Sequence, residues 1–176
     1  MVCRLSEEKI IPFALEVLKE VRKKMPDARL VIAGSGPEEE KIREKIRQLG
    51  LQDSVTLLGR REDVARLYQA FDVLLMPSIH EGFPVVAVEA MAAGLPILLS
   101  ASITRELDFY SALQYLPLNG PEPWASAIEN RDPDLNRELG RQEVKNQGLD
   151  IRDTVRTLEK IYEQDAGEEK CVWSRN

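Results

Sequence analysis

Apolar residues near the start of the chain recur three and four positions apart, the spacing of one face of an amphipathic helix. The positions that share this spacing are Ile10, Ile11, Ala14, Val17, Leu18 and Val21. Met25 stands directly before Pro26, and a residue before proline is pushed out of the α region. The pattern therefore predicts a helix that begins near Ile10 and ends before Pro26.

The rest of the chain alternates short apolar runs with segments of helical spacing. Residues 30–33, 54–58, 73–76, 97–99 and 113–116 are expected strands, and residues 38–49, 62–70, 85–93, 121–130 and 151–164 are expected helices. Gly50 and Gly94 follow two of these helices, where glycine commonly ends a helix. Apolar strands separated by helices indicate a parallel sheet covered on both faces. We therefore expect an α/β fold, one Rossmann-like doubly wound domain over residues 1–164, with ligands beyond the carboxyl ends of its strands.

The two ends of the chain depart from this regular pattern. Residues 165–176 are polar and lack periodicity, so a disordered tail is expected there. Only residues 1–5 stand where a first central strand of such a sheet is expected, so the sequence begins as if cut from something longer. A separate domain, a truncated gene product and one half of a split enzyme all fit this beginning.

Composition and charge narrow the function class. The 176 residues carry a net charge of −6, which argues against a nucleic-acid-binding face because such faces show a basic excess. No apolar run approaches the roughly 20 residues that span a bilayer, and the start has no signal segment. Cys3 and Cys171 have no metal-ligand spacing. We therefore expect a soluble, cytoplasmic protein with free thiols.

The stretch richest in chemistry is residues 77–96, with the sequence PSIHEGFPVVAVEAMAAGLP. It predicts a strand end, a tight glycine-containing turn and a short helix whose free amides can bind an anion or a sugar hydroxyl. Glu81 lies in the turn and Glu89 in the helix, roughly 12 Å apart along a helix axis. Carboxyl pairs that cleave glycosides lie within about 5–10 Å. The two glutamates are therefore expected to make two separate contacts with an extended ligand.

These residues resemble the signature of the family-4, or group 1, glycosyltransferases, retaining enzymes of the GT-B fold with two glutamates eight residues apart. CRLSEEK resembles the GRLxxEK opening of that family, and LVIAGSGP resembles its LVIVGDGP. The segment VTLLGRREDVARLYQAFDVLLMPS follows the same order, and SASITREL is most similar to the branch that builds capsular and exopolysaccharides. The resemblance implies the C-terminal, donor-binding half of a GT-B enzyme.

The resemblance also implies an activity and partners. Such an enzyme transfers a hexose from a nucleotide sugar, with a UDP-sugar as the main donor class, to a glycan or lipid-linked acceptor. It needs no metal or cofactor, because positive side chains and helix N-termini stabilise the leaving diphosphate. The acceptor-binding N-terminal GT-B domain, or a partner chain in its place, would form the other wall of the active site. Without that wall, weak donor binding and little transfer are expected.

The resemblance assigns roles to matching residues around the diphosphate and the sugar. Arg4 and Lys9 would hold the donor diphosphate; arginine suits bidentate phosphate contacts and lysine acts as a point charge. The residues implied for the donor sugar are Glu81, Gly82, Phe83 and Pro84. Of these, Glu81 would be the catalytic-site residue that positions the sugar. Cys3 stands where the family usually has glycine, so the phosphate-binding loop beside Arg4 is expected to be altered.

Further roles concern the nucleoside. Glu89 would bind the ribose hydroxyls. The loop implied to lie beside the base is Gly59, Arg60 and Arg61. Gly34 and Gly36 would let the backbone approach the donor closely, although a plain strand-to-helix turn would also explain them.

Several alternatives stay open. One alternative is another GT-B enzyme, such as an epimerase or a phosphorylase, although those enzymes lack this glutamate pair. The other is a non-catalytic nucleotide-binding or interaction module, which the missing first domain would support. His80 is expected to be a loop residue near the donor sugar. The sequence at residues 132–134, Asp-Pro-Asp, imitates a metal-binding DxD motif, but aspartate is a routine helix cap, so no metal site is expected.

Overall fold

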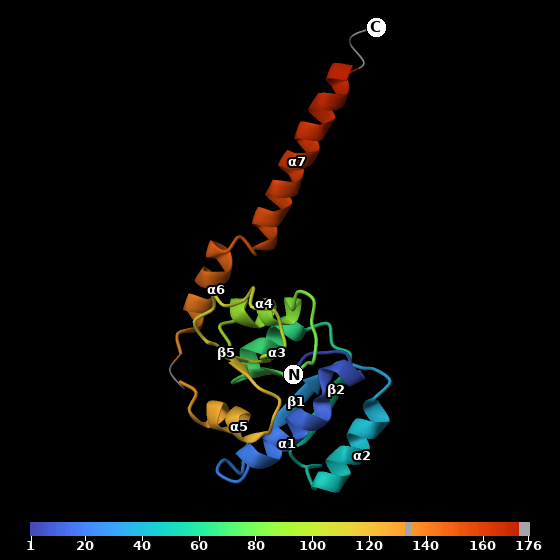
Figure 1. The fold of residues 1–176 in the computed structure, drawn as a ribbon, viewed down its shortest axis with the longest axis vertical. Coiled ribbons are helices and arrows are strands. Elements are labelled where there is room, and N and C mark those ends of the chain that lie inside the picture. Colours follow the sequence, from blue (N-terminus) through green and yellow to red (C-terminus); the bar gives the residue numbers. More distant parts are fainter. Residues whose placement is uncertain (133–134, 173–176) are drawn as a thin grey trace.

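A computed structural model of the protein describes residues 1–132 and 135–172 and shows an α/β domain (Figure 1). The strands are β1 (Leu30–Ala33), β2 (Val55–Gly59), β3 (Leu74–Met76), β4 (Ile97–Ser100) and β5 (Leu113–Leu116). The helices are η1 (Glu7–Lys9), α1 (Ile11–Val21), α2 (Glu39–Leu49), α3 (Val64–Ala70), α4 (Val85–Ala92), α5 (Glu122–Glu129), α6 (Arg137–Asn146) and α7 (Ile151–Val172). The expected strands are all present: β1 and β5 have the expected bounds, and no end of the other three differs from the expected one by more than one residue.

The strands pair in parallel throughout. β1 pairs with β2, and β4 lies between β3 and β5. Residues 1–5 run along the other side of β1: the Met1 ammonium donates to the Val31 carbonyl at 2.8 Å, and the Cys3 amide donates to the Ala33 carbonyl at 3.0 Å. This segment therefore adds a parallel neighbour to β1 at the position where the sequence places a first central strand.

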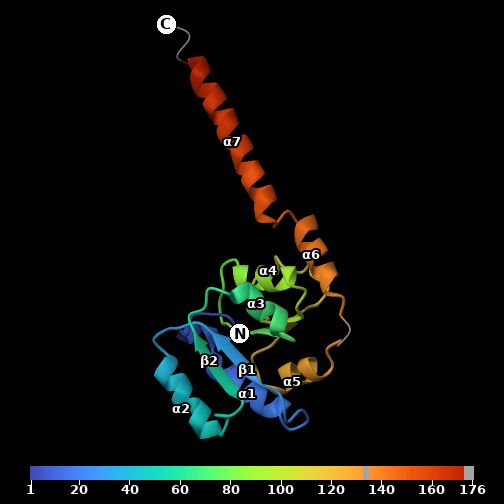
Figure 2. The ribbon, with the colours of Figure 1, turned by 180° about the vertical axis from the view of Figure 1, so that it is seen from behind.

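Alternate residues of β3 and β4 point into two separate hydrophobic cores. Leu75 and Leu98 belong to the core that includes residues of α1, α2 and α5. Their strand neighbours, such as Leu74 and Leu99, belong to the core that includes residues of α3 and α4. The two views of the ribbon show the helices grouped in the same way (Figures 1 and 2). Both faces of the three-stranded sheet β3–β4–β5 are therefore covered, while β1 and β2 pair in a two-stranded sheet of their own. This parallel arrangement confirms the Rossmann-like doubly wound fold.

Two glycines end helices as the sequence predicts. Gly50 has φ 67° at the end of α2, and Gly94 has φ 69° just after α4. Residues with a Cβ atom rarely adopt this left-handed conformation, whereas glycine adopts it readily.

The structure contains a helix, α6, that the sequence pattern did not predict. Gly140 stands in its middle, and glycine is a poor helix former. A Cβ atom at Gly140 would lie 2.4 Å from the Met91 carbonyl oxygen, so the close crossing of α6 over α4 requires glycine there. Arg137, at the start of α6, donates to the carbonyl oxygen of Phe71 at 2.6 Å, beside the end of α3. Tertiary packing therefore outweighs the local propensity.

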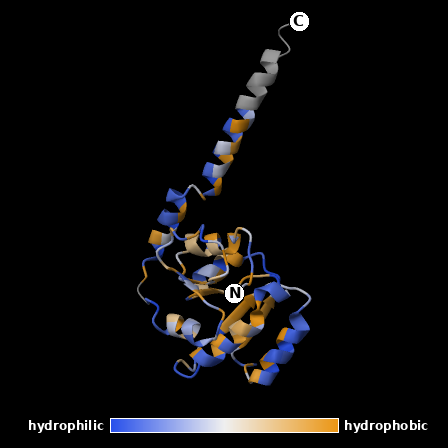
Figure 3. Ribbon diagram, in the orientation of Figure 1, coloured by the Kyte–Doolittle hydropathy of each residue, from blue (hydrophilic) through white to orange (hydrophobic). Residues whose placement is uncertain are grey.

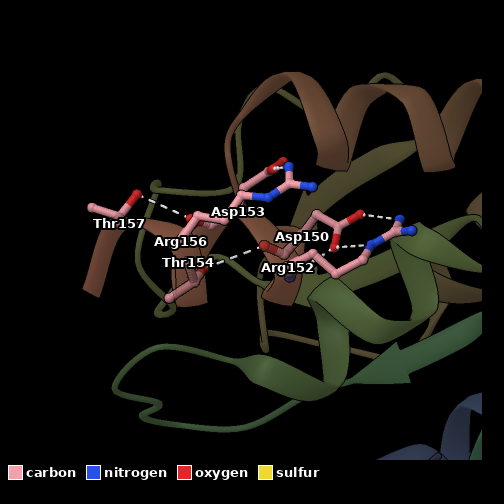
Figure 4. Close-up of polar contacts among 6 residues, drawn as sticks. All are labelled: Asp150, Arg152, Asp153, Thr154, Arg156 and Thr157. Atoms are coloured by element: carbon pink, nitrogen blue, oxygen red, sulfur yellow. Dashed lines mark hydrogen bonds and ion pairs between the residues drawn. The ribbon is translucent and has the colours of Figure 1, made fainter. Parts of the chain in front are cut away.

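Charged residues line the first turns of α7, beginning with Asp150 directly before the helix (Figure 4). One Asp150 oxygen accepts a hydrogen bond from the Arg152 amide at 3.0 Å, and the other is 2.5 Å from the Arg152 guanidinium. These bonds hold the pKa of the Asp150 carboxyl well below its usual range. Asp153, one turn later, pairs with Arg156 at 3.1 Å. The start of α7 is thereby fixed by local side-chain contacts.

Helix α7 then projects away from the body of the molecule (Figure 1). It runs to Val172 and so enters the segment that the sequence assigns to a polar tail; residues 173–176 lie outside the described residues, as do residues 133 and 134 of the DxD-like sequence. In the part of the chain that the structure describes, no helix has the length and apolar character needed to cross a membrane.

Candidate functional site

The predicted site residues gather beyond the carboxyl ends of β1 and β3, in two adjoining pockets. The first, here the Glu81 pocket, has a volume of about 270 Å³, and the predicted residues that line it are Arg4, Lys9, Glu81, Phe83 and Pro84. The second, here the Arg60 pocket, has a volume of about 240 Å³, and the predicted residues that line it are Arg4, Gly34, Arg60 and Arg61. Because Arg4 lines both, its guanidinium group is available to a ligand that spans the two.

A larger cavity of about 610 Å³ lies at the opposite ends of the strands. It is lined by α1 residues such as Val17 and Val21, and by Leu30 and Val73 at the starts of β1 and β3. Doubly wound sheets bind ligands at the carboxyl ends of their strands. None of the residues predicted for the site lines this cavity, so its size alone does not make it the site.

Glu81 is the centre of a short-range polar network. Its Oε1 atom is 2.6 Å from Lys9 Nζ, and it also accepts a hydrogen bond from Ser78 Oγ at 2.6 Å. The Lys9 and Glu81 side chains are only 16% and 13% exposed. A main-chain bond from the Ile79 amide to the Glu8 carbonyl, at 2.9 Å, holds the turn against the η1 segment. Two motifs far apart in sequence are therefore joined through both side chains and backbone.

The helix that Lys9 precedes begins with a strained residue. Ile10 has φ 41° and ψ 49°, in the left-handed region, between η1 and α1. A β-branched side chain in this conformation is a genuine outlier, and backbone strain of this kind clusters at functional sites. The sequence pattern counts Ile10 as the first apolar position of the helix, but the structure places it at the N-cap. Its turn lies directly beside Lys9.

Glu89 lies on α4 and has a different partner. The hydroxyl of Tyr68, on α3, donates to Glu89 Oε2 at 2.9 Å. The Tyr68 side chain is only 2% exposed, and burial together with the neighbouring carboxylate raises the pKa of its phenol. Glu89 itself is exposed and lines neither pocket. The two glutamates therefore present their carboxylates from different elements with different supports.

The remaining predicted residues form the edges of the site. Gly82 and His80 are exposed in the turn, and no described residue accepts a hydrogen bond from the amides of Gly82 and Phe83. The Arg61 guanidinium forms a bidentate ion pair with the Asp63 carboxylate, with hydrogen bonds of 2.7 and 2.8 Å. The turn therefore offers free amides, whereas the Arg61 guanidinium is already paired.

Gly34 and Gly36 approach the chain's own backbone closely. A Cβ atom at Gly34 would lie 1.8 Å from the Cys3 carbonyl oxygen, and one at Gly36 would lie 2.3 Å from that of Leu5. The Gly34 amide also donates to the Gly59 carbonyl at 2.8 Å. These glycines therefore allow the loop after β1 to pack against residues 1–5; an approach to a donor stays a prediction. Burial in this segment raises the pKa of the Cys3 thiol.

Sequence reasoning missed Ser78 and Tyr68, the two hydroxyl groups that support the glutamates. Ser78 lies inside the motif that drew attention to Glu81, so its nearness could have been noticed. Tyr68 precedes Glu89 by 21 positions, and no local pattern marks a contact between two different helices.

Comparison with known sequences gives a family. Residues 1–107 match the family described as "Glycosyl transferases group 1". EpsF of Bacillus subtilis (strain 168), which is named as a glycosyltransferase, is 36% identical over 165 residues. The match covers 92% of this chain but 43% of EpsF. The chain therefore spans less than half of the length of this relative.

Solved structures share the fold. The pneumococcal O-GlcNAc transferase GtfA, in complex with UDP and GlcNAc, superposes with a TM-score of 0.79 at 23% identity, over 93% of this chain and 34% of that one. The Anabaena protein HepE, in complex with UDP, gives 0.72 at 19% identity, over 92% and 47% of the two chains. Both similarities cover nearly the whole of this chain and only part of the other.

Proposed function

Because the chain belongs to the group 1 glycosyltransferases, we propose that it is the donor-binding half of a retaining family-4 enzyme. That enzyme transfers a hexose from a nucleotide sugar, with a UDP-sugar as the donor class, to a glycan or lipid-linked acceptor. The observation that carries the proposal is the grouping of Arg4, Lys9 and Glu81 around one pocket at the carboxyl ends of β1 and β3. The structural neighbours that contain UDP support the nucleotide class.

The donor diphosphate is assigned to Arg4 and Lys9. Arg4 is exposed and lines both pockets, so a diphosphate near it can connect a sugar in the Glu81 pocket with a nucleoside in the Arg60 pocket. Fixed positive groups stabilise the charge that develops on a leaving diphosphate, and they need not reorganise during the reaction. No metal is required in this scheme.

The sugar is assigned to Glu81 and the free amides of the turn, and the ribose to Glu89. Lys9 and Glu81 form an ion pair with 2.6 Å between Lys9 Nζ and Glu81 Oε1. A bound diphosphate would share the Lys9 ammonium, which leaves the Glu81 carboxylate freer to accept hydrogen bonds from sugar hydroxyls. Donor binding and sugar positioning are thereby linked through one ion pair.

The other wall of the active site is assigned to an N-terminal GT-B domain or to a partner chain that takes its place. The length of EpsF beyond the matched region leaves room for such a domain. Helix α7 supports the assignment because apolar residues recur along its described part (Figure 3), and five of them have exposed side chains. These are Ile151, Val155, Leu158, Ile161 and Tyr162, each 44% to 71% exposed. A stripe with this helical spacing is suited to pack against another surface.

Surface polysaccharide synthesis is the proposed setting, on the strength of the SASITREL segment at residues 100–107. Its acceptor would lie at the inner face of the membrane.

Calorimetric titration without added metal tests the proposal. The ligands are UDP, GDP, UDP-glucose, UDP-N-acetylglucosamine and GDP-mannose. We expect one nucleotide to bind with a Kd in the micromolar to millimolar range and Lys9→Met to weaken it. Lys24→Met is the matched control, because Lys24 forms an exposed ion pair with Glu129 next to Met25, which lines the cavity at the opposite ends of the strands. If the folded chain binds none of the five ligands, the donor assignment is wrong.

A further inference from the structure

Two buried hydroxyl groups outside the assigned ligand contacts each hold one of the two glutamates. Ser78 is 2% exposed and donates to Glu81 Oε1 at 2.6 Å. Tyr68 is 2% exposed and donates to Glu89 Oε2 at 2.9 Å. The two donors differ in their distance along the chain: Ser78 lies three residues before Glu81, just after β3, whereas Tyr68 belongs to α3 and lies 21 positions before Glu89.

A buried hydroxyl needs an acceptor, because burial without a hydrogen bond is costly. Elsewhere in this chain a backbone carbonyl satisfies that need. The Tyr110 hydroxyl, for example, donates to the Leu95 carbonyl at 2.8 Å. Tyr68 and Ser78 instead donate to carboxylates at the candidate site. Burial of the hydroxyl groups alone does not explain why their acceptors are carboxylates.

The arrangement leaves half of each carboxylate available. Ser78 and Lys9 both bind Glu81 Oε1, and Tyr68 binds Glu89 Oε2. No described residue donates to Glu81 Oε2 or to Glu89 Oε1. A carboxylate accepts hydrogen bonds through both oxygens. One oxygen of each glutamate is therefore anchored while the other can accept a hydrogen bond from a ligand.

We propose that Ser78 and Tyr68 are positioning residues that orient Glu81 toward the donor sugar and Glu89 toward the ribose before the donor binds. The proposal rests on the function proposed above. A side chain whose rotamer is already fixed loses less conformational entropy on binding. The two hydroxyls thus have separate roles. Tyr68 affects binding of the ribose, which UDP and a UDP-sugar share, and Ser78 affects binding of the sugar alone.

The division gives a test that a general loss of stability would not mimic. Tyr68→Phe and Ser78→Ala are titrated with UDP and with the UDP-sugar that binds the parent chain best. We expect Tyr68→Phe to weaken both ligands by the same factor of about 2–10, the cost of ordering one side chain on binding. We expect Ser78→Ala to weaken the UDP-sugar by a similar factor of about 2–10 and to leave UDP unchanged.

The matched controls remove hydroxyls of the same kind away from the site. Tyr110→Phe deletes a buried phenol oxygen that binds the Leu95 carbonyl, and Ser54→Ala deletes a buried serine hydroxyl before β2. Both are expected to bind the two ligands as the parent does, and thermal unfolding is measured for all four variants.

Two results would overturn the positioning roles while leaving the donor assignment intact. One is parent-like binding by both site variants. The other is an equal loss for UDP and UDP-sugar in Ser78→Ala that follows its loss of thermal stability. If the parent chain itself binds no nucleotide, the proposed function is wrong and the positioning roles fall with it.

Discussion

Lys9 Nζ lies 2.6 Å from Glu81 Oε1, although the two residues are 72 positions apart in the sequence. The contact joins the first helical turn of the chain to the turn before α4, and both side chains are largely buried. The residue pair assigned to diphosphate and sugar is therefore also a tertiary contact. Substitutions at this pair are expected to change folding stability as well as ligand binding.

Lys9→Met is expected to lower the free energy of unfolding by about 1–2 kcal/mol, because it leaves a partly buried carboxylate without its cation. Glu81 keeps the hydrogen bond from Ser78, which limits the loss. Urea denaturation measures it. The double variant Lys9→Met/Glu81→Gln should recover part of the stability, and a purely additive double variant would show that the pair is not coupled.

Ile10→Gly is expected to raise the free energy of unfolding by about 1 kcal/mol. Relief of the left-handed conformation gains about 1–2 kcal/mol, and the greater flexibility of glycine in the unfolded chain takes back part of it. The urea midpoint would rise. An unchanged or lower midpoint would mean that the contacts of the Ile10 side chain outweigh the backbone strain.

Gly140→Ala is expected to destabilise the protein by about 1–3 kcal/mol, the usual effect of overpacking, although alanine is the better helix former. The added Cβ would lie 2.4 Å from the Met91 carbonyl oxygen. Lys145→Ala, at an exposed position of the same helix, is the control and should be nearly neutral. Thermal unfolding distinguishes them, and a Gly140→Ala variant as stable as the parent would contradict the close crossing of α4 and α6.

Ionisation of Asp150 is expected to make the stability of the folded chain depend on pH, and the pKa shift sets the sign of that dependence. Hydrogen bonds from Arg152 lower the pKa of its carboxyl in the folded chain, so the folded state favours the ionised form. The stabilisation is present above the unfolded-state pKa of about 3.9 and is lost as the pH falls through the lower folded-state pKa. The helical circular dichroism of the parent should exceed that of Asp150→Asn at pH 7. The difference should disappear in strong acid; a constant difference at every pH would argue against a role for the charge.

The exposed stripe of α7 is expected to serve association and not the folding of this chain. Leu158→Ser should leave the urea midpoint unchanged, because Leu158 is 47% exposed. It should weaken binding to the separately produced part of EpsF that lies outside the region matched by this chain, measured by analytical ultracentrifugation. Lys160→Ala, on the other side of the helix, is the control. Equal binding by the parent and both variants would show that the stripe does not face the other half.

The sequence predicted the sheet and its helical layers well, because hydrophobic period and glycine position report directly on these features. β5 has the predicted bounds, and Gly50 and Gly94 end their helices as expected. Helix α6 was missed because its central Gly140 is explained only by the surface of α4, which lies far away in sequence. A local sequence pattern predicts local structure, but it does not predict a helix that depends on packing against a neighbouring helix.

The candidate site also has features that the sequence predicts and features that depend on packing between elements. The grouping of Arg4, Lys9 and Glu81 follows from motifs that can be read along the chain, and the structure brings these residues to one pocket. The anchoring of Glu89 by Tyr68 and the strained turn at Ile10 depend on packing between elements. Gly34 and Gly36 show a further limit: a glycine signals a close approach, but the sequence does not say what approaches.

The pairing of residues 1–5 with β1 determines how stably the candidate site is held against local unfolding. Arg4 and Lys9 belong to a segment held by a short row of main-chain bonds to Val31, Ala33 and the loop after it. Met1 and Leu5 belong to the core that includes α1, and Val2 packs against the core that includes α4, so this segment is covered on both faces. Segments buried in this way open at a free energy close to that of global unfolding. Amide hydrogen exchange in residues 1–5 should therefore be about as slow as in β1, and Arg4 would keep its place beside both pockets for as long as the molecule stays folded.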